Sequence, residues 1–330
     1  MEKHLDGDAA HPENLNPLRS ENLNPTHLEN LNLLRTEQSN PLTADLDTLS
    51  TLDMVRRMNT LDQEVPRQVG AETDAIARAV DLVVARLRTG GRLIYAGAGT
   101  SGRLGILDAS ECPPTFGVSP ELISGIIAGG QEAIFRAMEG VEDDEDQAAS
   151  DLAARSLTAR DVVLAIASSG RTPYCIGALK YADQVGAGRI SLSCNKQARL
   201  SEFAEVAIEV DSGPEAITGS TRLKAGTAQK LVLNMISTLS MVQLGHVYKN
   251  LMVGTRGINV KLDHRVLRLF VEATGNADLK RARCLLAEAD GSLKTAIVAE
   301  LAGVGVDEAA QALLSENGHV RNALSRLAQK

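Results

Sequence analysis

Apolar and polar residues alternate along the middle of the chain in blocks that predict strands and helices in turn. Five apolar runs have the length and composition of buried strands: 92–96, 122–128, 161–167, 189–194 and 206–210. Around these runs the patterns predict helices at 66–89, from 104 onward, 132–138, 144–155, 173–185 and 223–244. Strands and helices that alternate at this spacing predict an α/β fold with a doubly wound parallel sheet.

The two ends of the chain follow other patterns. Within 13–40 the sequence Glu-Asn-Leu-Asn recurs every eight residues and then decays, so we expect 1–40 to form a disordered arm. A three-residue apolar spacing over 44–59 predicts an amphipathic helix at the start of the α/β domain, which we place at 41–258. Residues 259–330 predict a small all-α domain with helices at 266–273, 277–289, 293–302, 306–314 and 320–327.

Composition narrows the class of protein. A chain of 330 residues can bury a large core, and none of its apolar runs is long enough to span a membrane. A net charge of −8 and an aromatic content of 2% argue against nucleic acid as a partner. The four cysteines are scattered without C-x-x-C spacing, so we expect reduced thiols and a cytoplasmic protein.

Histidine is scarce where catalysis or metal binding would need it. Three of the six histidines fall in the N-terminal arm, which leaves His246, His264 and His319. We therefore expect neither a structural zinc site nor a Ser-His-Asp triad. Any proton transfer would fall to carboxylates.

Two loops rich in glycine and hydroxyl side chains follow predicted strands. Residues 97–102 come after the first strand, and 168–172 come after the third. Both loops lie at the carboxyl edge of a parallel sheet, where N–H groups and helix dipoles favour a phosphate. The predicted phosphate-binding residues are Gly99, Thr100, Ser101, Gly102, Ser168, Ser169, Gly170 and Thr172, with Lys224 at the start of the long helix.

Two other phosphate-binding motifs fit the first loop less well. Its glycines are spaced as G-x-G-x-x-G, but the acid of a dinucleotide site is missing from the end of a second strand. The loop also lacks the Gly-Lys-Ser/Thr of a P-loop. The sequence therefore favours a phosphorylated small molecule over a nucleotide.

Acidic residues downstream of the first loop are candidates for acid–base chemistry. Glu111, next to Cys112 and two prolines, could be a general acid if it is partly desolvated, or a surface carboxylate, or a partner for Arg103. A second acid could come from the run Glu139, Glu142, Asp143, Asp144, Glu145 and Asp146. Spacing does not choose among these residues.

Several long motifs occur in the order found in a known family. Residues 97–103, 108–115, 168–173 and 218–230 resemble the signatures of the N-acetylmuramic acid 6-phosphate etherases, within the sugar isomerase (SIS) fold group. The resemblance covers 34–330. It implies a five-stranded flavodoxin-like sheet, a helical C-terminal extension, and a homodimer with sites near the subunit interface.

The resemblance also implies an activity. Enzymes of this family are lyases of amino-sugar metabolism and peptidoglycan recycling; they remove D-lactate from the 3-ether of a sugar phosphate and need no metal or nicotinamide cofactor. In the family pattern Glu111 matches the proton donor to the departing lactate and Glu142 the second catalytic acid. Two segments depart from that pattern: the repeats before Leu33, and 252–259, where Gly254 replaces an acid.

Two other functions remain as alternatives. An aldose–ketose isomerase of the same fold would also use a carboxylate base beside a sugar phosphate. A non-enzymatic sugar-phosphate sensor, similar to the glucokinase regulatory protein, would have two SIS modules in a much longer chain. One module together with Glu111 and Glu142 favours an enzyme with a small-molecule substrate, and neither nucleic acid nor membrane is expected as a partner.

Overall fold

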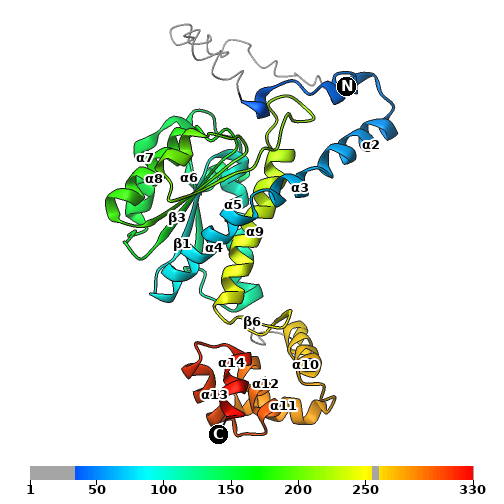
Figure 1. Cartoon of the computed structure of the whole chain (residues 1–330), viewed down its shortest axis with the longest axis vertical. Helices are drawn as coiled ribbons and strands as arrows, with labels where there is room; N and C mark the ends of the chain where they lie inside the picture. The colour runs from blue at the N-terminus through cyan, green and yellow to red at the C-terminus, as the bar shows by residue number, and fades with distance from the viewer. Residues whose placement is uncertain (1–33, 255–259, 330) are drawn as a thin grey trace, which may run out of the picture.

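Five parallel strands form the centre of the computed structural model, which describes residues 34–254 and 260–329 (Figure 1). They pair in the order β2-β1-β3-β4-β5, which is the flavodoxin-like order. The predicted parallel sheet is therefore confirmed. The strands are β1 (Leu93–Gly97), β2 (Ile123–Ile127), β3 (Val162–Ala167), β4 (Gly188–Ser193) and β5 (Val206–Glu209).

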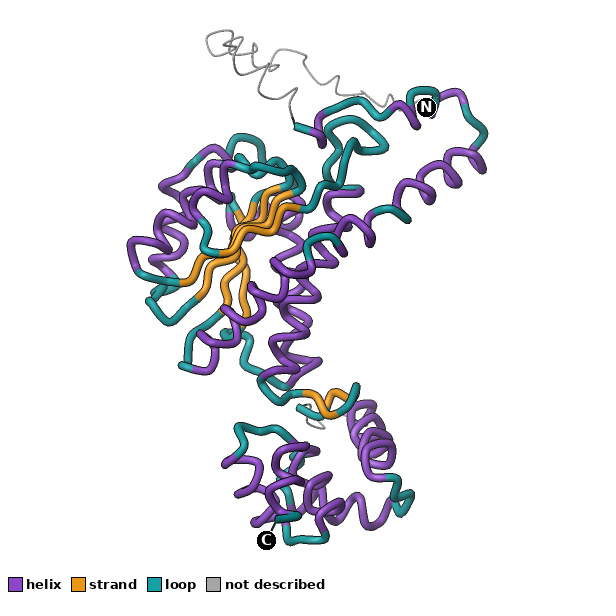
Figure 2. Tube along the Cα trace, in the orientation of Figure 1, coloured by secondary structure: helices purple, strands orange, loops and turns teal. Residues whose placement is uncertain are grey.

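Helices cover both faces of this sheet (Figure 2). One face packs against α4 (Thr73–Arg88), α5 (Gly99–Phe116) and α9 (Lys224–Gln243). The other packs against α7 (Glu145–Ala154) and α8 (Pro173–Val185), and α6 (Gly130–Phe135) lies beside β2. In β3, Leu164 belongs to the first core and Val163 to the second. Burial on both faces explains why β3 was visible as an unbroken apolar run.

The sheet has its topological switch point between β1 and β3. Their connections leave toward opposite faces, since β1 leads into α5 and β3 into α8. In open α/β sheets the ligand binds outside the carboxyl ends of the strands at this point. The topology therefore brings the two hydroxyl-rich loops together.

Three predicted helices begin or divide differently in the structure. The pattern at 44–59 forms α2 (Thr51–Asp62) only after the 3₁₀ turns Pro41–Thr43 and Leu46–Thr48. The helix expected from 66 is divided into α3 (Val65–Gly70) and α4. The helix expected from 104 starts at Gly99. Most of the loop predicted at 97–102 is therefore the first helical turn of α5. That first turn is polar, and apolar periodicity could not reveal it.

The N-terminal arm ends earlier than expected. Residues 34–40 lie against the sheet domain, with Leu34 and Thr36 buried and the side chain of Asn195 bonded to the Thr36 hydroxyl. The expected boundary at residue 40 is therefore wrong for these seven residues, because their buried contacts are with distant parts of the chain. The prediction of disorder for 1–33 lies outside the described residues.

The C-terminal part has its own core. A short hairpin, β6 (Val247–Tyr248) with β7 (Leu251–Met252), precedes it, and Phe270, Leu285 and Ile297 lie in the core that its helices share. These helices are α10 (Val260–Thr274), α11 (Leu279–Glu288), α12 (Leu293–Ala302), α13 (Val306–Ser315) and α14 (Val320–Leu327). The all-α prediction is confirmed, and the domain boundary at 258/259 stays a prediction.

Two features complete the description. The segment 252–259 differs from the family pattern at Gly254. A Cβ on Gly254 would overlap the backbone oxygen of Phe116, so the fold leaves no space for a side chain at this position. The rest of that segment, 255–259, lies outside the described residues. Among the helices of 34–254 and 260–329, none is long and apolar enough to cross a membrane.

Candidate functional site

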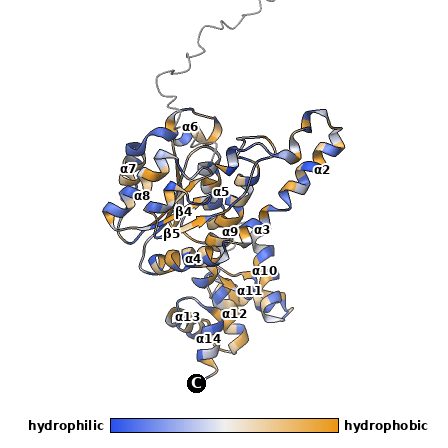
Figure 3. Ribbon diagram, turned by 45° about the horizontal axis from the view of Figure 1, so that its top comes forward, coloured by the Kyte–Doolittle hydropathy of each residue, from blue (hydrophilic) through white to orange (hydrophobic). Residues whose placement is uncertain are grey.

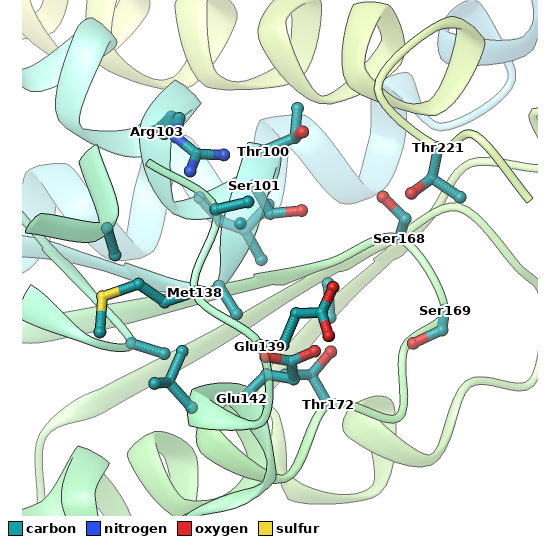
Figure 4. Close-up of a pocket in the computed structure, with 18 of the residues that line it drawn as sticks. Thr100, Ser101, Arg103, Met138, Glu139, Glu142, Ser168, Ser169, Thr172 and Thr221 are labelled. Atoms are coloured by element: carbon teal, nitrogen blue, oxygen red, sulfur yellow. The ribbon is translucent and has the colours of Figure 1, made fainter. Parts of the chain in front are cut away.

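A cavity of about 350 Å³ lies at the carboxyl ends of β1 and β3 (Figure 4). Both predicted loops contribute to it, so the structure brings them together as expected. Its size is at the lower end of the range for small-molecule sites. Of the predicted binding residues, those that line it are Gly99, Thr100, Ser101, Ser168, Ser169 and Thr172.

The starts of two helices make this cavity suited to an anion. Helix α5 begins at Gly99, and α8 begins at Pro173 directly after Thr172. Neither helix has an acid in its first turn, and neither N-cap side chain accepts a bond from the first-turn N–H groups. Helix α7, by contrast, has a capping aspartate and two acids. The positive ends of α5 and α8 are thus left for a ligand.

Gln229 of α9 links the two loops. Its side-chain oxygen accepts from Ser101 Oγ at 3.0 Å, and its side-chain nitrogen donates to Ser168 Oγ at 3.0 Å. The Gln229 side chain is fully buried. Sequence reasoning gave this residue no role, although a polar residue on the apolar face of a predicted helix was the available signal.

Two acids of the acidic run point into the cavity. Figure 4 shows the carboxyl groups of Glu139 and Glu142 projecting into the space near Thr172, below the turn that carries Thr100. Glu142 lies in the 3₁₀ turn Val141–Asp143, which follows Gly140 in the left-handed region at φ 78°. Both acids are placed to act on a ligand. The assignment of Glu142, rather than Glu139, as the second catalytic acid therefore stays a prediction.

Glu111 does not line the cavity of its own chain. It is exposed and lies twelve residues after Gly99 on α5, which corresponds to about 18 Å of helix at 1.5 Å per residue. Since α5 packs along the sheet after a βα loop, it carries Glu111 away from the carboxyl edge. The idea that Glu111 pairs with Arg103 finds no support, because Arg103 lines the cavity and donates to Ile134 O and Arg136 O, each at 2.9 Å.

Three other predicted binding residues, Gly102, Gly170 and Lys224, do not line the cavity. The N–H of Gly102 bonds to Ala98 O, and a Cβ on Gly170, at φ 68°, would overlap Ala198 Cβ. Lys224 is buried, and its Nζ donates to Pro214 O at 3.1 Å. Burial lowers the pKa of Lys224 below its ordinary value, although the nearby Glu215 opposes this shift.

Glu37, which the sequence analysis assigned to the disordered arm and gave no role in binding, lines the cavity. It comes from the 3₁₀ turn Arg35–Glu37, far from the other lining residues in the sequence. No local pattern could have placed it there. Within 34–254 and 260–329, no three His, Cys, Asp or Glu residues form a group suited to a metal ion.

The sheet domain is of the SIS type, because two family models of SIS domains match it. The family model described as "SIS domain" matches residues 141–239, and "Glucokinase regulatory protein N-terminal SIS domain" matches 75–183. A solved structure of the phosphoheptose isomerase GmhA from Neisseria gonorrhoeae is similar at 15% identity and a TM-score of 0.46, over 58% of this chain and 98% of that one. A likeness this distant carries no argument about function.

Curated relatives are much more similar. An N-acetylmuramic acid 6-phosphate etherase from Pectobacterium atrosepticum is 56% identical, over 86% of this chain and 93% of its own length. Another from a Geobacillus species is 54% identical over 86% of this chain and 95% of its own length. The chain therefore belongs to the N-acetylmuramic acid 6-phosphate etherase family.

Proposed function

We propose that this protein is a carbon–oxygen lyase that cleaves the D-lactyl ether of N-acetylmuramic acid 6-phosphate. The products are N-acetylglucosamine 6-phosphate and D-lactate. The observation that carries the proposal is the 56% identity with an etherase over nearly that relative's whole length. We expect the protein in the cytoplasm, because its four cysteines are scattered without C-x-x-C spacing. We expect its reaction to belong to amino-sugar metabolism.

The phosphate is held where α5 and α8 begin. Hydroxyls of Thr100, Ser101, Ser168, Ser169 and Thr172 surround this part of the cavity, and the first-turn N–H groups add unpaired donors. The other three predicted residues shape the loops around this pocket and do not contact the phosphate. Gly170 is closely packed, the Gly102 N–H bonds to the backbone, and Lys224 Nζ donates to a backbone oxygen.

Carboxylates then carry out elimination and hydration. In the open-chain sugar, H2 is acidic because it is alpha to the C1 aldehyde, and Glu142 removes it as the base. Glu111 protonates the lactyl oxygen as the bond from C3 breaks. Water then adds at C3 of the unsaturated aldehyde, and C2 regains a proton. These proton transfers require neither a metal nor a redox cofactor.

The position of Glu111 leads us to propose a homodimer in which each site takes this acid from the other copy. Leu107, one turn before Glu111, is 52% exposed. Helix α2 extends away from the sheet domain with apolar residues on its surface (Figure 3), and Leu52 and Val55 are 57% and 60% exposed. A second copy would cover both apolar surfaces and bring Glu111 to the cavity that holds Glu142.

Incubation with N-acetylmuramic acid 6-phosphate in heavy water tests the activity. Free D-lactate and a product with deuterium at C2 are expected. Intact substrate after long incubation with protein that binds it would favour a sensor, and deuterium at C2 without lactate release would favour an isomerase. Glu111→Gln and Glu142→Gln should each reduce turnover by about 10²–10⁴-fold and leave phosphate-dependent binding intact.

A further inference from the structure

Residues 34–40 form a strap that passes over the edge of the site. Asn195, just after β4, holds its first turn: its side-chain oxygen accepts from Arg35 N at 2.8 Å and from Thr36 N at 3.4 Å. Its side-chain nitrogen donates to Thr36 Oγ1 at 3.0 Å. Thr36 is fully buried in this arrangement.

Further contacts fix the strap relative to the cavity. The same Asn195 nitrogen donates to Ser168 O at 3.0 Å, which ties the strap to the second phosphate loop. Arg35 Nη1 lies 3.0 Å from Asp211 Oδ2, and Asn40 Nδ2 donates to Pro214 O at 3.2 Å. The Arg35–Asp211 pair is exposed and contributes little by itself. The buried Asn195 bonds therefore determine where the strap lies.

This strap places the Glu37 side chain in the cavity wall. The half-buried Glu37 lines the same cavity as Thr100, Ser168 and Glu142. A Cβ built on Gly219, at φ 75°, would lie 3.1 Å from Glu37 Oε2, so the carboxylate packs against a position without a side chain. Within the described parts of the chain, the Glu37 carboxylate makes no hydrogen bond or ion pair.

We propose that Glu37 is a further substrate-contacting residue, whose carboxylate accepts a hydrogen bond from a hydroxyl or amide N–H of the sugar. The inference rests on the proposed function, namely that the cavity holds an amino-sugar phosphate. A dianionic phosphate has no proton to donate and repels a carboxylate, whereas the sugar offers several donors. Glu37 therefore binds the sugar part of the substrate, while the two loops hold its phosphate.

Equilibrium dialysis with two ligands tests this division of roles. N-acetylglucosamine 6-phosphate, the proposed product, carries sugar and phosphate, and inorganic phosphate carries only the part held by the loops. Glu37→Ala should weaken binding of the sugar phosphate by about 10- to 100-fold, as for a hydrogen bond to a charged group. Binding of inorganic phosphate should stay within about twofold, and it also reports that the variant is folded.

Two further variants sharpen the test. Glu288→Ala removes an exposed glutamate on α11 and should bind both ligands as the wild type does. Asn195→Ala releases the strap and should weaken sugar-phosphate binding, and adding it to Glu37→Ala should cause less than the sum of the two losses.

Three outcomes would overturn the inference. If Glu37→Ala binds the sugar phosphate like the wild type, the carboxylate does not contact the sugar. If both ligands weaken equally, Glu37 supports the phosphate loops instead. If the wild-type protein binds phosphate but not N-acetylglucosamine 6-phosphate, the proposed function itself fails, and the role of Glu37 fails with it.

Discussion

Two inactive variants, Glu111→Gln and Glu142→Gln, should restore activity to each other when their subunits are mixed. Helix α5 carries Glu111 about 18 Å along its axis from Gly99 at the cavity. Glu142 lines that cavity and Glu111 does not. In the proposed dimer, each site would combine Glu142 of one copy with Glu111 of the other. A mixed dimer then contains one site with both acids and one site with neither.

The expected magnitude follows from the pairing of subunits. Random exchange in an equal mixture gives about half mixed dimers, each with one of its two sites complete, so activity per subunit should reach about one quarter of the wild-type value. Each variant alone should be lower by about 10²–10⁴-fold. The gain on mixing is therefore large compared with the background.

D-lactate release from N-acetylmuramic acid 6-phosphate is the assay, after the two variants have been unfolded and refolded together. Native mass spectrometry of subunits with different tags measures the fraction of mixed dimers. As a control, wild-type subunits are mixed with the double variant. If Glu111 acts across the interface, activity per wild-type subunit should fall to about half, because each mixed dimer then has no complete site.

Verified mixed dimers without activity above the parental background would refute this arrangement. Undiminished activity per wild-type subunit in the control would refute it independently. Either result would place Glu111 in the site of its own chain, or outside the chemistry altogether.

Three further predictions concern residues that the structure places around the site or away from it. Gln229→Leu leaves the hydroxyls of Ser101 and Ser168 without their common partner, and phosphate affinity measured by dialysis should fall about tenfold. Gly170→Ala should weaken phosphate binding more than Gly291→Ala, whose glycine has a similar φ of 75° but open space around it. Asp161→Asn should lower the free energy of unfolding by about 2–4 kcal/mol, because the buried carboxylate accepts from Arg92 and Thr158. Burial alone would raise the pKa of Asp161, but these bonds outweigh it and hold the pKa below its ordinary value. The deficit of the variant in urea denaturation should therefore be full above about pH 4 and shrink as the pH falls below it; a deficit that grows in acid would contradict the assignment.

The centre of the sheet could be predicted because β1 and β3 are buried along their whole length. Residues such as Val163 and Leu164 of β3 pack into opposite cores, and this leaves an apolar run with no polar interruption. The meeting of the two hydroxyl-rich loops could also be predicted, because strand order and the direction of parallel strands determine it. Both features follow from local patterns combined with a general rule of topology.

The contacts that complete the site could not be predicted in this way. Glu37 reaches the cavity because Asn195, 160 residues beyond Arg35, holds the turn before it. Gln229 links two hydroxyls from loops that are separate in the sequence. Such contacts form only in the packed structure, and neither the periodicity of apolar residues nor their spacing along the chain predicts them. The strap was consequently assigned to a disordered arm.

Glu111 illustrates how closeness in sequence differs from closeness in space. It follows the first loop by about ten residues, which suggested a common site, but a helix converts those residues into a rigid rod that leaves the cavity. In the proposed dimer the same helix serves two sites, since its first turn binds phosphate in one and its last turns supply the acid to the other. A substitution that shifts α5 along its axis should therefore impair phosphate binding and proton donation together, although the two functions are at opposite ends of the helix. This coupling gives a physical reason for one long helix to carry both motifs.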